Sequence, residues 1–340
     1  MNVRIASAAY AVPPEIEKVE AVLARETTRV EAALAPLTPR SRDRAKEGLG
    51  LDRVRVCGAK QPFDLALEAA SAALKEAGVS SQHLDLIVDY STFPGEDHQV
   101  SFAHKLSAEL GAETSLNISF KAGGCAGLHL AIKTAIAYMN MDPKIQTALL
   151  VTGDTPPKGN RTLLPVTVQG DAGSAMVLRR QGDNPEADGP KIEGPEILDT
   201  RVLTLGHLYD AISLVRTNGH LGIAVNALQI EHEVMPIYYL NLYRLVQEAL
   251  EATSLSLKDI DHFIYSNISQ RDREGFGRIL GLNDTKLPVT PMTEYGHTFA
   301  SDLIINYVTL RRSGNIQPGQ LLLFASAGIG FTWGVTLARV

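Results

Sequence analysis

The residues Lys-Ala-Gly-Gly-Cys-Ala-Gly at positions 121–127 decide how the rest of the chain is interpreted. They join residues 115–120 (SLNISF), which have the composition of a short strand, to residues 127–139 (GLHLAIKTAIAYM), a mostly apolar segment of helical length. A strand, a glycine-rich turn and a helix in this order predict an α/β fold with Cys125 at the turn.

Cys125 is a candidate nucleophile because of this setting. A thiol near a helix N-terminus lies close to free N–H groups and to the positive end of the helix dipole, which favour the reactive thiolate. Gly123, Gly124 and Gly127 allow the backbone to come close to a substrate. The alternative is a small buried apolar side chain, the usual state of an isolated cysteine. Cys57, in VRVCGAK, has no such turn, and we expect it to be structural.

Strand-like and helix-like segments alternate on both sides of this turn. In the first half we expect strands at 3–12, 84–92, 147–155 and 174–180, and helices at 63–77 and 101–110 that stop at Gly78 and Gly111. A stretch rich in Gly, Pro and charge, residues 181–196, reads as a surface connection. In the second half we expect strands at 197–206, 262–269 and within 321–338, and helices at 235–252 and 299–311.

The two halves share a pattern. Residues 75–92 (KEAGVSSQHLDLIVDYST) and 251–268 (EATSLSLKDIDHFIYSNI) each contain the end of a helix, then an Asp-Leu or Asp-Ile pair, then an apolar strand. This similarity predicts a duplicated α/β unit, with halves at 1–180 and 197–340 related by a pseudo-two-fold axis. Chance similarity between two helix–strand units is the alternative.

Composition excludes several classes of protein. The chain has 340 residues and a formal net charge of −6, so a strongly basic nucleic-acid binder is not expected. With 2 cysteines, neither a disulfide-rich secreted scaffold nor a four-cysteine zinc site is expected, and a reducing cytoplasm is the simplest compartment. Residues 321–338 carry no charge, but their glycines and hydroxyl side chains fit two strands better than a membrane helix.

A cysteine nucleophile needs a proton acceptor, and His297 is the strongest candidate. It lies in Tyr-Gly-His-Thr-Phe-Ala-Ser-Asp, where Asp302 follows it by five residues and can orient the imidazole. His207 and His220 flank a stretch of unclear structure, and either is a candidate for a pocket wall. His129 is expected in the core. The other histidines are expected to be solvated or structural: His83, His98, His104, His232 and His262.

These motifs together resemble the β-ketoacyl-ACP synthase III branch of the thiolase superfamily. The matching segments run in order over nearly the whole chain: LALEAASAALKEAG, LDLIVDYST, GGCAGLHLAI, LLVTGD, GDAGSAMVL, YGHTFAS and GIGFTWGVTLARV. The resemblance implies a five-layered αβαβα fold, a homodimer, and an acyl-thioester donor on coenzyme A or an acyl carrier protein. It implies no metal or other cofactor, and it assigns Cys125 as the residue that takes the acyl group.

The chain departs from that family pattern at two positions. A ketosynthase of this branch has a His in a His-Gln-Ala-Asn run, whereas residues 266–269 here read Ser-Asn-Ile-Ser. The family's later Asn is here His297. Those two groups stabilise the enolate formed when a malonyl thioester loses CO2. The set Cys125, His297 and Asp302 instead resembles ketosynthase-III-like acyltransferases of natural-product pathways, which acylate a hydroxyl or an amine of a small molecule.

The resemblance also assigns supporting groups. The backbone N–H groups of Cys125 and Ile329 would form the oxyanion hole, and Arg271 matches a basic position that binds the coenzyme A or carrier-protein donor. The residues Arg40, Arg42 and Arg44 are a second basic candidate. Two other functions stay open: a decarboxylative condensing enzyme with a rebuilt site, and a non-catalytic partner subunit of a synthase.

Overall fold

The computed structural model describes residues 2–26, 47–93, 101–121, 123–164, 166–182, 192–217, 220–282 and 291–340. Its main element is a 9-stranded sheet. The first half of the chain contributes, in spatial order, β5 (Leu116–Ser119), β4 (Leu86–Asp89), β6 (Thr147–Asp154), β9 (Ala172–Gln181) and β1 (Asn2–Ala11). The second half continues with β10 (Glu196–Thr204), β15 (Thr332–Arg339), β14 (Leu321–Gly328) and β13 (Ile260–Tyr265).

Strand pairing repeats between the halves. In the first half β1–β9 and β9–β6 are antiparallel and β6–β4 is parallel. In the second half β10–β15 and β15–β14 are antiparallel and β14–β13 is parallel. The two sets meet where β1 pairs with β10, through Arg4 and Glu196. This repeated pattern supports the duplication that the sequence predicts, although the boundaries 1–180 and 197–340 stay a prediction.

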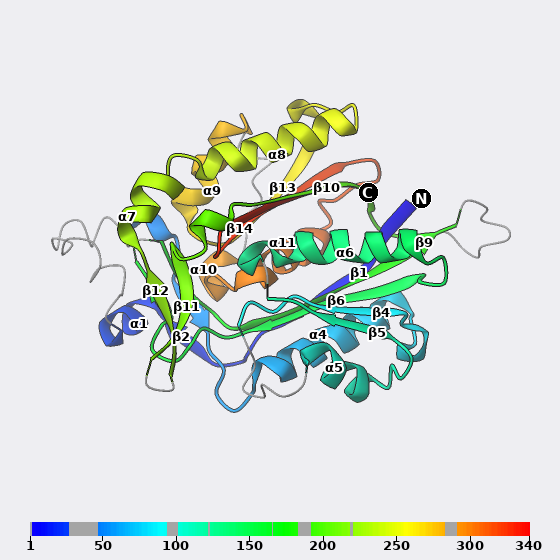
Figure 1. Ribbon diagram of the computed structural model, residues 1–340, viewed down its shortest axis with the longest axis horizontal. Coiled ribbons are helices and arrows are strands. Elements are labelled where there is room, and N and C mark those ends of the chain that lie inside the picture. The colour runs from blue at the N-terminus through cyan, green and yellow to red at the C-terminus, as the bar shows by residue number, and fades with distance from the viewer. Residues whose placement is uncertain are drawn as a thin grey trace.

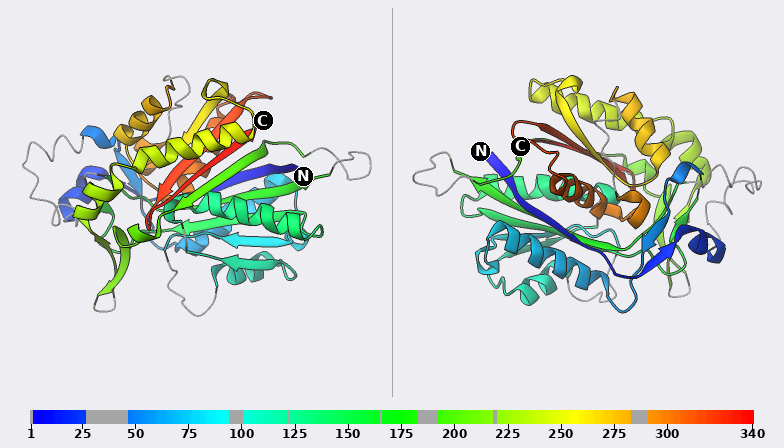
Figure 2. Two further views of the ribbon diagram at one scale, coloured as in Figure 1. Left: turned by 45° about the horizontal axis from the view of Figure 1, so that its top comes forward. Right: turned by 180° about the vertical axis from the view of Figure 1, so that it is seen from behind.

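Helices lie in three layers separated by strands (Figures 1 and 2). Helices α4 (Pro62–Ala77) and α5 (Phe102–Leu110) cover the outer face of the first-half strands. Helices α6 (Gly127–Met141) and α11 (Asp302–Arg312) lie between the two sets of strands, and α8 (Tyr238–Ala252) and α9 (Gln270–Ile279) cover the outer face of the second set. The order is α, β, α, β, α, and the expected thiolase-like α/β fold is confirmed.

Alternation along buried strands fills both faces of the sheet. On β14, Leu321 and Leu323 pack in the core under α8, while Leu322 and Phe324 pack in the central core around α6 and α11. Successive side chains of a strand point to opposite faces, so a continuous apolar run is what a strand covered on both sides requires. This explains why residues 321–338 form two strands. In the part of the chain that the structure describes, no helix is long and apolar enough to cross a membrane.

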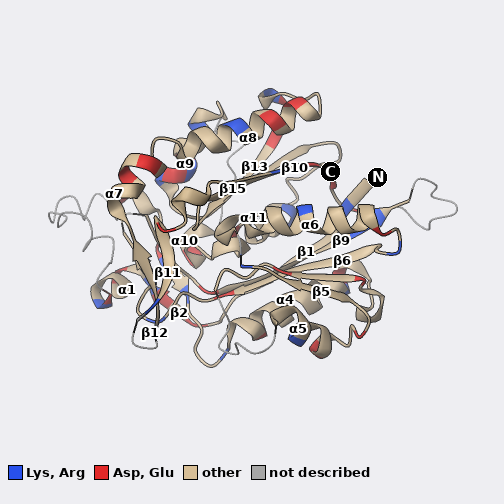
Figure 3. Ribbon diagram, in the orientation of Figure 1, with Lys and Arg blue, Asp and Glu red and all other residues tan. Residues whose placement is uncertain are grey.

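The outer helices, unlike these strands, are apolar on one face only. The charged residues of α8 are Arg244, Glu248 and Glu251, none of which is buried, and Figure 3 shows charge of both signs on this helix. Its buried side chains, Leu242, Leu245, Val246 and Ala249 among them, recur at helical spacing and face the sheet. This helix is amphipathic because only one of its faces meets the core.

Helix ends largely follow the sequence signals. Helix α4 ends at Gly78, whose φ of 63° is the left-handed conformation that glycine adopts without steric cost. Two starts differ from expectation. Helix α8 begins at Tyr238, after a π-helical segment Ile230–Val234, rather than at residue 235. Helix α11 begins at Asp302, because residues Phe299–Ser301 form a 3-10 turn first.

Smaller elements surround one end of the sheet (Figure 1). They are the hairpin β11 (Ile212–Thr217) and β12 (His220–Val225), the pair β2 (Ile16–Lys18) and β3 (Arg53–Arg55), the pair β7 (Thr162–Leu163) and β8 (Thr167–Val168), and the short helices α1 (Val19–Arg25), α7 (Ala227–Gln229) and α10 (Met292–Tyr295). The candidates Arg40, Arg42 and Arg44, and most of the expected connection 181–196, lie outside the described residues.

Candidate active site

Cys125 lies where the sequence places it, in the turn between β5 and α6. The turn begins with Gly123 and Gly124, whose φ angles of 95° and 48° are left-handed. Residues Gly124–Ala126 form a 3-10 turn that runs directly into α6. The cysteine is 5% exposed and packs against the rings of Phe93 and Phe299. These glycines bend the chain sharply enough to put the thiol at the helix N-terminus.

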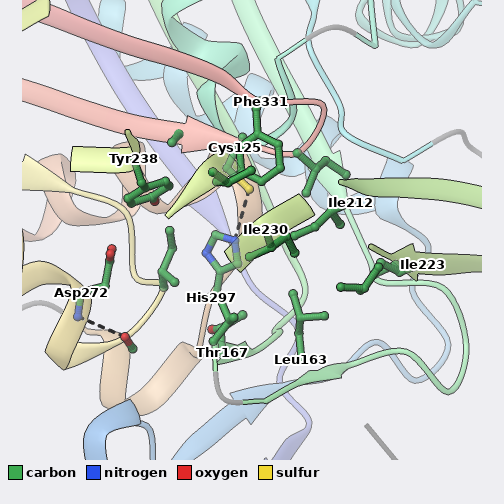
Figure 4. Close-up of a pocket in the computed structure, with 18 of the residues that line it drawn as sticks. Cys125, Leu163, Thr167, Ile212, Ile223, Ile230, Tyr238, Asp272, His297 and Phe331 are labelled. Atoms are coloured by element: carbon green, nitrogen blue, oxygen red, sulfur yellow. Dashed lines mark hydrogen bonds between the residues drawn. The ribbon is translucent and has the colours of Figure 1, made fainter. Parts of the chain in front are cut away.

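Three side chains form a continuous hydrogen-bonded chain. The Sγ of Cys125 lies 3.2 Å from Nε2 of His297, and Nδ1 of His297 lies 2.6 Å from Oδ2 of Asp302. All three are buried, and Figure 4 shows the sulfur and the imidazole facing each other at the cavity wall. Cys125 comes from the first half of the chain and the other two from the second, so folding of both halves assembles the set. Nucleophile, base and orienting acid in this order are the geometry of an acyl-transfer site.

The carboxylate of Asp302 is fixed by further donors. Its Oδ1 accepts from the backbone N–H and the hydroxyl of Thr298, at 2.7 and 2.6 Å. Its Oδ2 accepts from the backbone N–H of Asn267 at 2.7 Å as well as from His297. Because every one of these donors is buried, Asp302 cannot rotate away, and the imidazole that it holds keeps one orientation.

The pKa of His297 is raised well above its ordinary value of 6.5. Burial alone lowers the pKa, but the negative charges of Asp302 and Cys125 and the hydrogen bonds to both outweigh burial. The protonated imidazole is therefore the favoured form beside a thiolate. Two of the raising contributions come from Cys125, so they disappear when its sulfur carries no charge.

Backbone strain accompanies this arrangement. Phe299, between His297 and Asp302, has a φ of 58°, which is unfavourable for a bulky side chain. The resulting 3-10 turn reverses the chain, so that the Thr298 hydroxyl and His297 both reach the same carboxylate. The ring of Phe299 packs edge-on against Phe93, with centroids 4.7 Å apart. The packed core around the turn holds it in this conformation.

The predicted oxyanion groups lie on facing segments. The end of β14 comes so close to the cysteine turn that a Cβ on Gly328 would lie 1.8 Å from the Gly123 carbonyl oxygen and 2.6 Å from the Cys125 backbone nitrogen. On the other side, a Cβ on Gly124 would lie 2.9 Å from the Ile329 backbone nitrogen. Only glycine permits this approach, which brings the two segments carrying the expected N–H groups together.

A cavity of about 590 Å³ opens at the cysteine and is lined mostly by apolar side chains. Leu163, Ile212, Ile223 and Phe331 line it, as Figure 4 shows. The main polar or charged side chains at its wall are Cys125, His297, Thr167, Gln169, Ser269, Asp272, Glu231 and Arg271. An apolar cavity with a few polar groups beside a nucleophile is suited to an acyl chain.

The remaining sequence candidates fall elsewhere. His129 is fully buried, with Nδ1 2.8 Å from the Thr336 hydroxyl, and burial lowers its pKa to about 3, so it is a core residue as expected. The pKa of Cys57 is raised to about 12 by burial and by Asp171. His207 is exposed and is not among the described residues lining the cavity. His220 opens β12, and its side chain is outside the described part.

Several cavity residues have no counterpart in the sequence-based candidates. Asp272 is one: the hydroxyl of Tyr239 donates to its Oδ1 at 2.9 Å, and burial raises the pKa of Asp272 to about 6. The hairpin β11–β12 also contributes to the site without having been a sequence-based candidate. Its residues Leu214 and Leu221 pack against the cluster that contains Cys125. One feature of the sequence could have predicted this hairpin. Asn-Gly at 218–219 stands between alternating apolar segments, which is a strong hairpin pattern.

The fold and the buried cysteine define a thiolase-like enzyme, and three comparisons agree. Residues 250–340 match the family model "3-oxoacyl-[acyl-carrier-protein] synthase III C terminal". The chain is 30% identical over 284 residues to the β-ketoacyl-[acyl-carrier-protein] synthase III of Rhodospirillum rubrum, covering 82% of this chain and 84% of that one. The chain belongs to the β-ketoacyl-[acyl-carrier-protein] synthase III branch of the thiolase superfamily, as the sequence motifs predicted.

Solved structures share the fold at lower identity. The 3-oxoacyl-[acyl-carrier-protein] synthase III of Aquifex aeolicus aligns over 99% of this chain and 100% of its own, with a TM-score of 0.81 and 20% identity. The acyltransferase ChlB3 aligns over 100% of this chain and 98% of its own, with a TM-score of 0.80 and 21% identity. These similarities establish the architecture.

Proposed function

We propose that this protein is an acyltransferase that moves an acyl group from a thioester, through an acyl-enzyme on Cys125, to a hydroxyl or amine of a small molecule. The observation that carries the proposal is the buried chain from Cys125 through His297 to Asp302. An alcohol or amine must lose a proton as it attacks a thioester, and an imidazole oriented by a carboxylate can accept it.

The first half-reaction loads the enzyme. The Cys125 thiolate attacks the carbonyl carbon of the donor thioester, and the tetrahedral intermediate places its oxyanion against the backbone N–H groups proposed at Cys125 and Ile329. The carbon–sulfur bond to the donor then breaks. The leaving thiolate takes the proton from His297, so the free donor thiol departs and His297 becomes neutral.

The second half-reaction uses that neutral imidazole. Acylation removes the charge on Cys125, and with it two contributions that raise the pKa of His297. His297 accepts the proton of the acceptor hydroxyl or amine as the acceptor attacks the acyl carbon. The bond to Cys125 breaks, and the thiolate and the protonated His297 are restored. Each half-reaction thus leaves His297 in the protonation state that the next one requires.

The donor end of the site follows from the cavity and the family. Arg271 is exposed at the cavity wall, where a cation suits the phosphates of coenzyme A or the acidic face of an acyl carrier protein. The names of the curated relatives refer to an acyl carrier protein, which supports that donor. We also propose the homodimer expected from the family.

The residues around the cavity favour transfer over decarboxylative condensation. Among the described residues that line it, His297 is the one histidine. Ser266 stands at the first position of the run that replaces the family's His-Gln-Ala-Asn, where the family has its His. It is fully buried and is not among the described residues lining the cavity, so an imidazole to stabilise an enolate is missing from that position. The fold shared with ChlB3, described as an acyltransferase, is consistent with this reading.

A decarboxylative condensing enzyme is the second candidate, favoured by the synthase names of the curated relatives. The two are separated by incubating the protein with malonyl and with simple acyl thioesters of coenzyme A and of a carrier protein. The proposal predicts a mass adduct on Cys125 and no CO2 release. Loss of CO2 with a new carbon–carbon bond would establish condensation. Equal transfer by wild type and Cys125→Ala would exclude both.

A further inference from the structure

Besides Oδ2 of Asp272, two neighbouring residues of the cavity wall each have a buried polar atom with no hydrogen-bond partner among the described residues. The hydroxyl oxygen of Thr167 and the side-chain amide oxygen of Gln169 are both buried and unpaired. Thr167 is 2% exposed and Gln169 is 4% exposed, and both side chains line the cavity that holds Cys125. Buried polar atoms are nearly always paired in folded proteins, so these atoms in one cavity wall call for a polar group that binds there.

Backbone hydrogen bonds hold the segment with Thr167 and Gln169 next to His297, the proposed base. Gln169 pairs with His297 in an isolated parallel bridge. The backbone N–H of His297 donates to the Val168 carbonyl at 3.0 Å, and the N–H of Gly170 donates to the His297 carbonyl at 3.0 Å. Figure 4 shows the Thr167 side chain beside His297 in the cavity wall. The segment that carries both oxygens is therefore fixed beside His297, where an acceptor would be deprotonated.

Elsewhere the cavity wall near these residues is apolar. Leu163 pairs with Thr167 across the β7–β8 ladder and also faces the cavity, as does Val166. The hydrocarbon part of an acyl chain has neither a donor nor an acceptor, so its binding would leave both oxygens unpaired. The Gln169 amide oxygen can be satisfied only by an N–H or O–H group of a ligand, whereas the Thr167 hydroxyl can accept from or donate to a ligand hydroxyl.

We infer that Thr167 and Gln169 form an acceptor subsite beside His297, and that the acceptor carries a second hydroxyl or amino group besides the one acylated. This inference rests on the proposed acyltransferase function. The second group donates to the Gln169 amide oxygen or the Thr167 hydroxyl while the first gives its proton to His297. An acceptor with one hydroxyl leaves both oxygens unpaired in the transfer complex, and the site discriminates against it.

The test compares two acceptors on protein already loaded at Cys125: cyclohexanol and its trans vicinal diol, which share the ring. Single-turnover loss of the acyl adduct, followed by intact mass, reports transfer alone. Wild type is expected to transfer to the diol about tenfold faster or more than to cyclohexanol, the range that one or two buried hydrogen bonds provide. Thr167→Val and Gln169→Met are each expected to reduce that ratio severalfold, and Thr167→Ser to keep it.

Thr162→Val is the matched control. Thr162 lies on the same hairpin and its hydroxyl oxygen is also buried and unpaired, but it is not among the described residues lining the cavity. The diol preference of Thr162→Val should equal that of wild type. If it falls as in Thr167→Val, the effect comes from hairpin stability and the subsite is wrong.

Two other results would overturn the subsite while leaving the proposed function intact. One is a loaded wild type that discharges equally fast to both acceptors. The other is a Thr167→Val or Gln169→Met protein whose loss lies in the rate of loading by the thioester, which would assign these oxygens to the donor. Absence of any adduct on Cys125 would instead refute the proposed function itself.

Discussion

At the residue scale, the properties of His297 follow from what its two nitrogens touch. Nδ1 faces a carboxylate held by three further donors, and Nε2 faces a sulfur atom. A buried imidazole without these partners would lose its proton readily, as His129 does, with a pKa lowered to about 3. The same residue type in the same molecule therefore favours the protonated form in one place and the neutral form in another.

Asp302→Asn tests that dependence. The substitution removes a negative charge that raises the pKa of His297, so this pKa falls. Transfer from the acyl-enzyme requires neutral His297, and its rate in the variant should reach a plateau at lower pH than in wild type. The plateau should also drop by about 10²- to 10⁴-fold, because the imidazole is no longer oriented. Adduct decay measured across about pH 5 to 9 gives both quantities.

An Asp302→Asn profile that superimposes on the wild-type profile would mean that Asp302 does not act through His297. The Thr298→Val variant is a useful comparison. It removes one donor to the carboxylate, at 2.6 Å, but keeps the charge. It should shift the pH midpoint less than Asp302→Asn does.

The sequence revealed these catalytic candidates because each carries a local signal. Cys125 lies in a glycine-rich turn before a helix. Asp302 follows His297 by five residues, close enough in sequence to suggest a pair. Thr167 and Gln169 carry no such signal. Their importance depends on burial without a partner and on a bridge to His297 from a distant part of the chain, which only the folded structure shows.

At the element scale, the approach of β14 to the turn before α6 is the contact that completes the site. Gly328 allows it because there is no room for a side chain between this strand and the Gly123 carbonyl. The same loop contains Gly330, which has a φ of 76° but open space where a Cβ would lie. The two glycines therefore serve different purposes, one spatial and one conformational.

Gly328→Ala is expected to abolish loading of Cys125, because the added methyl group would force the strand and the cysteine turn apart. Gly330→Ala should cost about 1 to 2 kcal/mol of stability and still load. Thermal unfolding measures the loss of stability, and intact mass after incubation with an acyl thioester measures loading of Cys125. Equal loading by both variants would contradict the tight contact.

Elements differed in how well their sequences predicted them. Helix α4 was predicted within one residue because its apolar spacing and its terminal Gly78 agree. Helix α8 starts later than expected, because residues 235–237 form a turn between the π-helical segment and the helix. Pro236 in this turn has no N–H to donate, and apolar spacing does not reveal that the helix starts only after it.

At the scale of the whole molecule, the order of segments predicted the α/β class, and the resemblance predicted the layers. Strand order in space does not follow from periodicity, because β1 lies between β9 and β10 and β15 pairs back onto β10. These pairings bring together residues from both halves. The order of the strands along the chain does not predict these pairings, because each pairing depends on packing between distant segments.

One such long-range contact, between α6 and β15, determines in part how the free energy of unfolding depends on pH in acid. His129 on α6 bonds to Thr336 on β15, and it fits because Gly334 has no side chain there. The pKa of His129 is about 3 in the fold against 6.5 for a free histidine. The unfolded chain therefore binds a proton that the native state does not between these values. This residue lowers the free energy of unfolding by about 1.4 kcal/mol for each pH unit below 6.5.

His129→Leu should remove that slope. Urea unfolding measured at several values between about pH 4 and 7 should show a weaker loss of stability on acidification than in wild type, whatever the variant's stability at neutral pH. An unchanged slope would mean that His129 is accessible to protons in the native state.

The central claim is that a Cys125 acyl-enzyme forms and that His297 drives its discharge to a hydroxyl or amine. The most direct measurement follows the intact mass of wild type and of His297→Ala after a pulse of acyl thioester and a chase of acceptor. The account predicts that the wild-type adduct on Cys125 disappears on adding acceptor, while an adduct on His297→Ala persists. Equal discharge in both proteins, or an adduct at any residue other than Cys125, would contradict it.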